Sequence, residues 1–264
     1  MTSFVNFFLN GMAFLIFHLG MSVYGAENVP LIIGMELGYP PFEMIDPSGN
    51  PAGISVELAQ ALGEHLNRKI KIENIPFLGL IPALKTEKID LILSSMSITT
   101  QRKASIDFSE PYLKIGLSLL VNMNSPLQSI AEANDPKYKF VVKAGTSGEV
   151  YARQNLAAAK IIVLDKETSC VLEVVQGKVD AFIYDQLSVY QNWEKNPQTT
   201  RALLKPFDVE DWGIGVRKGN EDLLLQVNEF LRSFKAQDGI KRIVQKFLEP
   251  QLRTFQEMGI PFVF

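Results

Sequence analysis

The chain has 264 residues, 47% of them apolar and 21% charged, which is the composition of a folded globular protein with room for one large domain or two modest ones. Its 26 Lys and Arg residues and 29 Asp and Glu residues give a formal net charge of −3, without any basic block, so we expect no nucleic-acid partner. The single cysteine, Cys170, can form no internal disulfide, and the core must supply the stability.

An uncharged segment opens the chain. Residues 1–25 contain no Asp, Glu, Lys or Arg, and Phe, Leu, Ile, Met and Gly dominate residues 4–21. This pattern predicts a secretory signal peptide over residues 1–25, cleaved after Gly25, although the usual basic residue near the start is missing. An uncleaved membrane anchor is the alternative, because about 18 apolar residues could just span a bilayer. The rest of the chain is expected on the far side of a membrane.

Strands and helices alternate after this segment. We expect strands at 29–35, 69–75 and 89–95 and helices at 54–67 and 79–86. The order strand, helix, strand, helix, strand predicts a parallel α/β unit.

A second alternating series follows. We expect strands at 116–123, 139–145, 160–164, 179–185 and 212–219 and helices at 147–159, 167–177, 186–195, 220–237 and 240–248. The two series fit two α/β units of roughly a hundred residues each.

The sequence offers no constellation for catalysis or metal binding. Of its two histidines, His18 lies in the predicted signal peptide and His65 on a predicted helix, which leaves no Ser-His-Asp or Cys-His arrangement. There is no CxxC, no HExxH and no Asp-rich calcium loop, and residues 213–219, GIGVRKG, lack the GxGxxG spacing. We therefore expect no catalytic residue, no metal and no cofactor.

Polar groups gather at the end of the predicted strand 89–95. The stretch SSMSITTQR, residues 94–102, brings five hydroxyls and one guanidinium directly after an apolar run. The planar guanidinium of Arg102 can bind a carboxylate through two parallel hydrogen bonds, and Ser95 and Ser97 supply hydroxyls and N–H groups beside it. A solvated surface arginine is the ordinary alternative.

Two further strand ends carry polar residues. The stretch AGTSGE, residues 144–149, ends a predicted strand and opens a helix, so the N–H groups around Thr146 and Ser147 suit an anion. Asp185 ends another strand and can receive an ammonium. Ser147 and Asp185 could instead be ordinary helix caps. Because open α/β sheets bind ligands at strand ends, these groups together suit a small zwitterion.

Several stretches in order resemble the family 3 extracellular solute-binding proteins, the amino-acid receptors of bacterial ABC importers. They are GYPPFEMIDPSGNPAGISVELAQAL, GLIPALKTEKIDLILSSMSITTQRKASIDFSEPYL, AGTSGEVYA, GKVDAFIYD and GIGVRKGN. The resemblance implies an α/β fold of two lobes joined by two crossing strands, with the ligand cleft between them. Residues 29–117 and 214–264 would form lobe I and residues 118–213 lobe II. The tail 251–264 runs past the usual end of the family, and we expect it to pack across a lobe or to contact a partner.

The resemblance also implies roles for the polar residues. Arg102 would clamp the ligand's α-carboxylate with help from Ser97 and Ser147. Asp185 would bind the α-ammonium, and Ser95 would add a backbone carbonyl or hydroxyl contact.

Three further residues would surround the ligand's side chain. Tyr39 matches the aromatic residue that packs over it, and Phe77 stands where many members carry Trp. Glu36 matches a position that is often acidic in receptors for basic amino acids, so we hypothesise arginine, lysine or histidine as the ligand. Glu36 could instead face solvent or pair with Lys143.

The resemblance thus implies a monomeric periplasmic receptor that closes around one amino acid and presents it to a membrane-embedded ABC permease. Two alternatives remain. One is a periplasmic dehydratase of the prephenate or arogenate type, with Glu36, Glu149 or Lys143 as its acid or base. The other is the ligand-sensing component of a signalling system.

Overall fold

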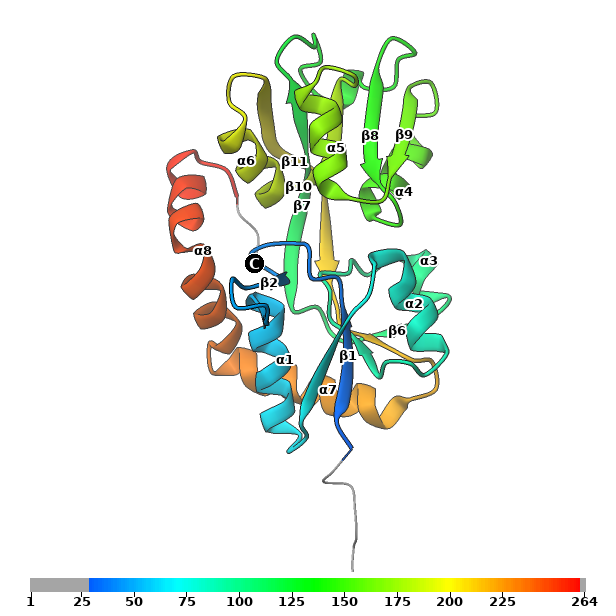
Figure 1. The fold of residues 1–264 in the computed structure, drawn as a ribbon, viewed down its shortest axis with the longest axis vertical. Helices are drawn as coiled ribbons and strands as arrows, with labels where there is room; N and C mark the ends of the chain where they lie inside the picture. The colour runs from blue at the N-terminus through cyan, green and yellow to red at the C-terminus, as the bar shows by residue number, and fades with distance from the viewer. Residues whose placement is uncertain (1–28, 262–264) are drawn as a thin grey trace, which may run out of the picture.

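The computed structural model describes residues 29–261 and shows an α/β fold built around two five-stranded sheets (Figure 1). The predicted signal peptide, residues 1–25, lies outside the described residues. We call the half around the sheet of β1 (Leu31–Met35) lobe I and the half around the sheet of β8 (Lys139–Lys143) lobe II. This two-lobed architecture confirms the predicted fold class. No helix within the described range is long and apolar enough to cross a membrane.

Lobe I has the strand order β4-β1-β5-β12-β6, and β1 runs parallel to both neighbours. Its other elements are β2 (Met44–Ile45), β3 (Pro51–Ala52), α1 (Ile54–His65), β4 (Ile70–Asn74), α2 (Phe77–Lys85), β5 (Leu91–Ile92), α3 (Thr100–Lys103), β6 (Asp107–Phe108), β12 (Gly215–Val216) and α7 (Glu221–Ala236). Because side chains alternate along a strand, β1 serves two cores. Leu31 and Ile33 pack in the cluster that contains α1, whereas Ile32 packs in that of α2.

Lobe II has the strand order β11-β7-β10-β8-β9. Its elements besides β8 and the two long strands described next are η1 (Ile130–Glu132), α4 (Ser147–Asn155), β9 (Lys160–Leu164), α5 (Glu167–Val175), β10 (Ala181–Asp185) and α6 (Gln186–Lys195). The same alternation places helices on both faces. Phe140 and Val142 of β8 pack in the cluster that contains Ala152 of α4, whereas Val141 packs in that of Cys170.

Two long antiparallel strands join the lobes, as Figure 1 shows. β7 (Leu113–Asn122) and β11 (Thr200–Trp212) pair over most of their length, with a register shift between Leu203 and Asp208. The boundaries predicted for the lobes fall inside β7, between residues 117 and 118, and just after β11, between residues 213 and 214. These boundaries remain predictions.

Several elements differ from the sequence-based expectation. No strand was predicted over residues 200–211, where β11 runs, because Pro206 and exposed polar residues interrupt the alternation at this sheet edge. The strand predicted at 212–219 is reduced to β12, and α4 ends at Asn155 rather than at 159.

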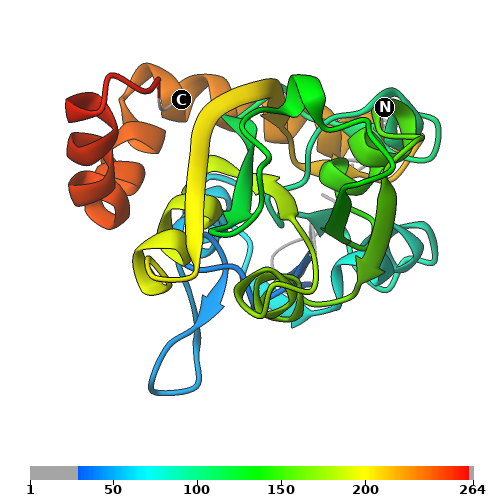
Figure 2. The ribbon, with the colours of Figure 1, turned by 90° about the horizontal axis from the view of Figure 1, so that it is seen from above.

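The last helix is also longer than predicted. α8 (Gly239–Glu257) continues past residue 248 and through Pro250, and Val244, Leu248 and Phe255 are its buried apolar side chains. The ring of Phe255 is fully buried 5.3 Å from that of Tyr190 on α6. Figures 1 and 2 show α8 along the outside of the molecule. The part of the tail that the structure describes therefore packs across lobe II, one of the two roles expected for it.

We predict that Phe255→Ala lowers the free energy of unfolding by about 3–5 kcal/mol, because it removes a buried ring at the contact between α8 and lobe II. Urea unfolding measures this. Met258→Ala is the control: Met258 is 44% exposed, and its replacement should change stability by less than about 0.5 kcal/mol. Equal effects of the two replacements would show that the tail does not contribute to the core.

Candidate functional site

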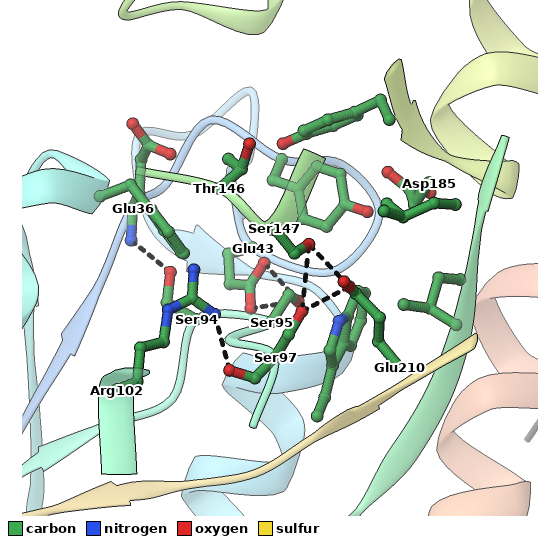
Figure 3. A pocket seen from close by; sticks show the side chains of 16 residues that line it. Glu36, Glu43, Ser94, Ser95, Ser97, Arg102, Thr146, Ser147, Asp185 and Glu210 are labelled. Atoms are coloured by element: carbon green, nitrogen blue, oxygen red, sulfur yellow. Dashed lines mark hydrogen bonds between the residues drawn. The ribbon is translucent and has the colours of Figure 1, made fainter. Parts of the chain in front are cut away.

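A pocket lies between the lobes at the ends of β5, β8 and β10 (Figure 3). All nine side chains singled out in the sequence line it: Glu36, Tyr39, Phe77, Ser95, Ser97, Arg102, Thr146, Ser147 and Asp185. The free volume of this pocket is only about 50 Å³, which is room for a few water molecules. A larger ligand therefore enters only when the lobes move apart.

Arg102 lies on the lobe I side of the pocket. It belongs to α3, whose N-cap Thr99 accepts a hydrogen bond from the Arg102 N–H. The guanidinium is buried and donates from Nη1 to the Ser97 carbonyl at 2.6 Å and from Nη2 to the Gly145 carbonyl of lobe II at 2.8 Å. Burial lowers the Arg102 pKa to about 10, so the side chain stays protonated at neutral pH. No carboxylate of the described residues lies within ion-pair distance of it.

The start of α4 faces Arg102 from lobe II. Gly145 has a φ of +73°, which lets the chain turn sharply from β8 into α4. The Thr146 hydroxyl donates to the Lys143 carbonyl at 2.7 Å and does not cap the helix. The first N–H groups of a helix have no partner within it, so those at Ser147 suit an anion.

Asp185 ends β10 and is both a cap and an open acceptor. Its Oδ1 accepts the Ser188 N–H at 2.9 Å and so caps α6, which was the ordinary alternative for this residue. Its Oδ2 is buried, and no donor of residues 29–261 meets it in hydrogen-bond geometry. Burial raises the Asp185 pKa, while the nearby Tyr39 hydroxyl lowers it. The open oxygen suits a ligand cation.

Aromatic rings form the apolar walls of the pocket. Tyr39 stacks on Phe42 with ring centres 5.2 Å apart and meets Trp212 edge-on at 6.1 Å. The ring of Phe77 lies 5.4 Å from the Arg102 guanidinium and 5.5 Å from the Lys143 ammonium. Phe77 therefore packs against two cations in the closed pocket.

Glu36 forms an ion pair with Lys143, which links lobe I to lobe II. Both side chains are largely buried. This pairing is one of the alternatives that the sequence left open for Glu36. A ligand cation could use Glu36 only in competition with the Lys143 ammonium.

Two acidic residues of the pocket were not predicted from the sequence. Glu43 follows Tyr39 in the same motif and is fully buried, with hydrogen bonds from the hydroxyls of Ser55 at 2.7 Å and Ser95 at 2.8 Å. Burial raises its pKa to about 8. The Ser95 hydroxyl is thus engaged within the protein.

The other unpredicted acid is Glu210, on β11. Its Oε2 accepts hydrogen bonds from Ser97 of lobe I and Ser147 of lobe II, both at 2.7 Å. Burial raises its pKa. No sequence signal identified this residue, because no strand was predicted there.

The chain is similar to proteins of known function. Residues 31–250 match the family model of bacterial extracellular solute-binding proteins, family 3. The L-cystine-binding protein TcyJ of Escherichia coli is 30% identical over 84% of this chain and 83% of its own, and the L-arginine-binding protein of Pseudomonas aeruginosa is 33% identical over 84% and 89%. The crystal structure of the ancestral amino acid-binding protein AncCDT-1, a precursor of cyclohexadienyl dehydratase, superimposes with a TM-score of 0.75 at 31% identity, over 83% of this chain and 94% of that one.

The raised pKa of Glu43 predicts a pH dependence of stability. The folded state holds a proton on Glu43 between pH 4.5 and about 8 that the unfolded state has lost, so the free energy of unfolding falls as the pH rises, by up to about 1.4 kcal/mol per pH unit. Between pH 6 and 8, the free energy of unfolding of the wild type should fall by on the order of 2 kcal/mol, as urea unfolding measures. The Glu43→Gln variant should not show this fall. Glu64→Gln, at an exposed position, should leave the fall unchanged. Identical pH profiles of wild type and Glu43→Gln would contradict the assignment.

Proposed function

The chain belongs to the bacterial extracellular solute-binding proteins, family 3, and we propose that it binds one amino acid in the pocket between its lobes. One observation carries this proposal. Among the described residues, the protonated Arg102 guanidinium has no carboxylate within ion-pair distance, and the buried Asp185 Oδ2 has no hydrogen-bond donor; both groups face the same pocket, from different lobes. Figure 3 shows Arg102 and Asp185 on opposite sides of that pocket. A zwitterion brings the charge that each of them lacks.

The ligand's two charged groups would bind at different places. The α-carboxylate would take the free donors of Arg102 and the N–H group of Ser147 at the start of α4. Thr146 would line the site beside it, since its own N–H and hydroxyl both donate to the Lys143 carbonyl. Each charge-assisted hydrogen bond contributes about 1.5–3 kcal/mol. The α-ammonium would bind Asp185 Oδ2.

Tyr39 and Phe77 would cover the ligand's side chain. The Ser97 hydroxyl donates to Glu210, so it would help hold the carboxylate only by turning from Glu210 to the ligand. The Ser95 hydroxyl donates to Glu43, so we propose that Ser95 contacts the ligand through its backbone carbonyl. Glu36 would remain paired with Lys143.

Binding would be coupled to closure of the lobes. Closure removes water from the contacts of Arg102 and Asp185 and so strengthens them, while the ligand supplies charges that stabilise the closed state. The hinge motion would occur in β7 and β11, the two strands that join the lobes. The lobes themselves would span residues 29–117 with 214–264, and residues 118–213.

The closed form is proposed to deliver the amino acid to a membrane-embedded ABC permease. The family is extracellular, and the sequence predicts a signal peptide over residues 1–25, so we place the mature protein in the periplasm as a monomer.

A dehydratase would require at least one of the residues suggested as its acid or base to be free. Of the three residues considered for a dehydratase, Glu36 and Lys143 neutralise each other, and Glu149 accepts the Gly145 N–H and pairs with Arg153. We therefore predict that the purified protein forms no phenylalanine from arogenate, as chromatography measures. Turnover that exceeds the spontaneous rate would establish the enzymatic alternative.

We predict that Arg102→Ala weakens amino-acid binding at least about hundredfold, because it removes two or more charge-assisted hydrogen bonds. A thermal-shift screen of the common amino acids identifies the ligand, since a ligand that binds the folded state raises the melting temperature. Calorimetry then compares the variants. Lys103→Ala, at the exposed neighbouring position, should bind like wild type. Unchanged affinity in a folded Arg102→Ala variant would refute the carboxylate site.

A further inference from the structure

Glu210 has an open acceptor oxygen at the pocket. Both hydroxyl donors, Ser97 and Ser147, bind its Oε2. Among the described residues, none donates a hydrogen bond to its Oε1. The side chain lines the same pocket as Asp185 and reaches it from β11, and Figure 3 shows it between the two serines and Asp185.

The charges around the pocket do not balance. The Lys143 ammonium is neutralised by Glu36. Glu43 is mostly protonated at neutral pH, since burial raises its pKa to about 8. Asp185 and Glu210 then remain as two carboxyl groups without a cation in ion-pair contact in the described part of the chain, and burial raises the pKa of both. One guanidinium, that of Arg102, stands against them and lowers the pKa of Glu210.

A zwitterion alone leaves this imbalance in place. Its carboxylate would compensate Arg102 and its ammonium would compensate Asp185, so one desolvated carboxylate would still lack a counter-charge. A second positive charge on the ligand would supply it. In a closed, water-poor pocket this attraction extends over several ångströms and requires no direct contact.

On the basis of the proposed function, we propose that Glu210 determines the ligand class, by making the pocket selective for amino acids with a positively charged side chain. Glu36, which the sequence suggested for this role, is already paired with Lys143. The selective charge therefore comes from a crossing strand and not from the first lobe.

L-Arginine and L-citrulline test this assignment, because they have nearly the same shape and differ by one positive charge. Calorimetry should show that the wild type prefers L-arginine. Glu210→Gln keeps an oxygen acceptor for the serine hydroxyls, and it should reduce that preference at least about tenfold. Glu173→Gln is the matched control: it removes a carboxylate of lobe II that pairs with Lys178 outside the pocket lining, and it should retain the preference.

Two results would overturn the inference while the proposed function stands. They are a wild type that binds amino acids but does not prefer L-arginine to L-citrulline, and a Glu210→Gln variant that keeps the full preference. If that variant also binds both ligands more tightly by the same factor, Glu210 competes with the ligand's carboxylate. A wild type without the preference refutes the inference even if the variant does not fold. A wild type that no amino acid stabilises would refute the proposed function, and the inference with it.

Discussion

One costly arrangement governs this molecule: among the described residues, the buried carboxylate of Asp185 has no cation in ion-pair contact. Removing a charged group from water costs several kcal/mol unless the protein or a ligand compensates it. At Asp185 one oxygen caps α6, but the other is buried without a donor. The structure offers that oxygen no counter-charge, and burial accordingly raises the pKa of the group. A ligand ammonium would remove this cost, so ligand binding and closure would stabilise each other.

The fold explains why the opposite charges meet across one pocket. In each lobe the parallel strands end at one edge of the sheet. That edge carries Ser97 and Arg102 after β5 in lobe I, and Asp185 at the end of β10 in lobe II. The crossing strands then hold the two edges face to face. Three polar links close the gap in this state: Arg102 to the Gly145 carbonyl, Lys143 to Glu36, and Glu210 to a serine of each lobe.

Local patterns were enough to predict much of this structure. Apolar runs that alternate with helical periodicity marked both α/β units, and the polar residues singled out after those runs line the pocket: Ser95, Ser97, Arg102, Thr146, Ser147 and Asp185. The features that were not predicted depend on contacts between residues far apart in the sequence. Glu36 and Lys143 are 107 residues apart, and nothing around Glu210 distinguishes it from a surface acid until β11 places it beside Ser97, 113 residues away. The last helix was predicted to end at residue 248, yet the buried face of α8 continues through Pro250 to Phe255.

The most direct measurement is a crystal structure of the protein with the amino acid that raises its melting temperature most. The account predicts the ligand's carboxylate against Arg102 and the start of α4, and its ammonium within hydrogen-bond distance of Asp185 Oδ2. A complex in which the ligand binds elsewhere, or in which that oxygen faces only water, would contradict it.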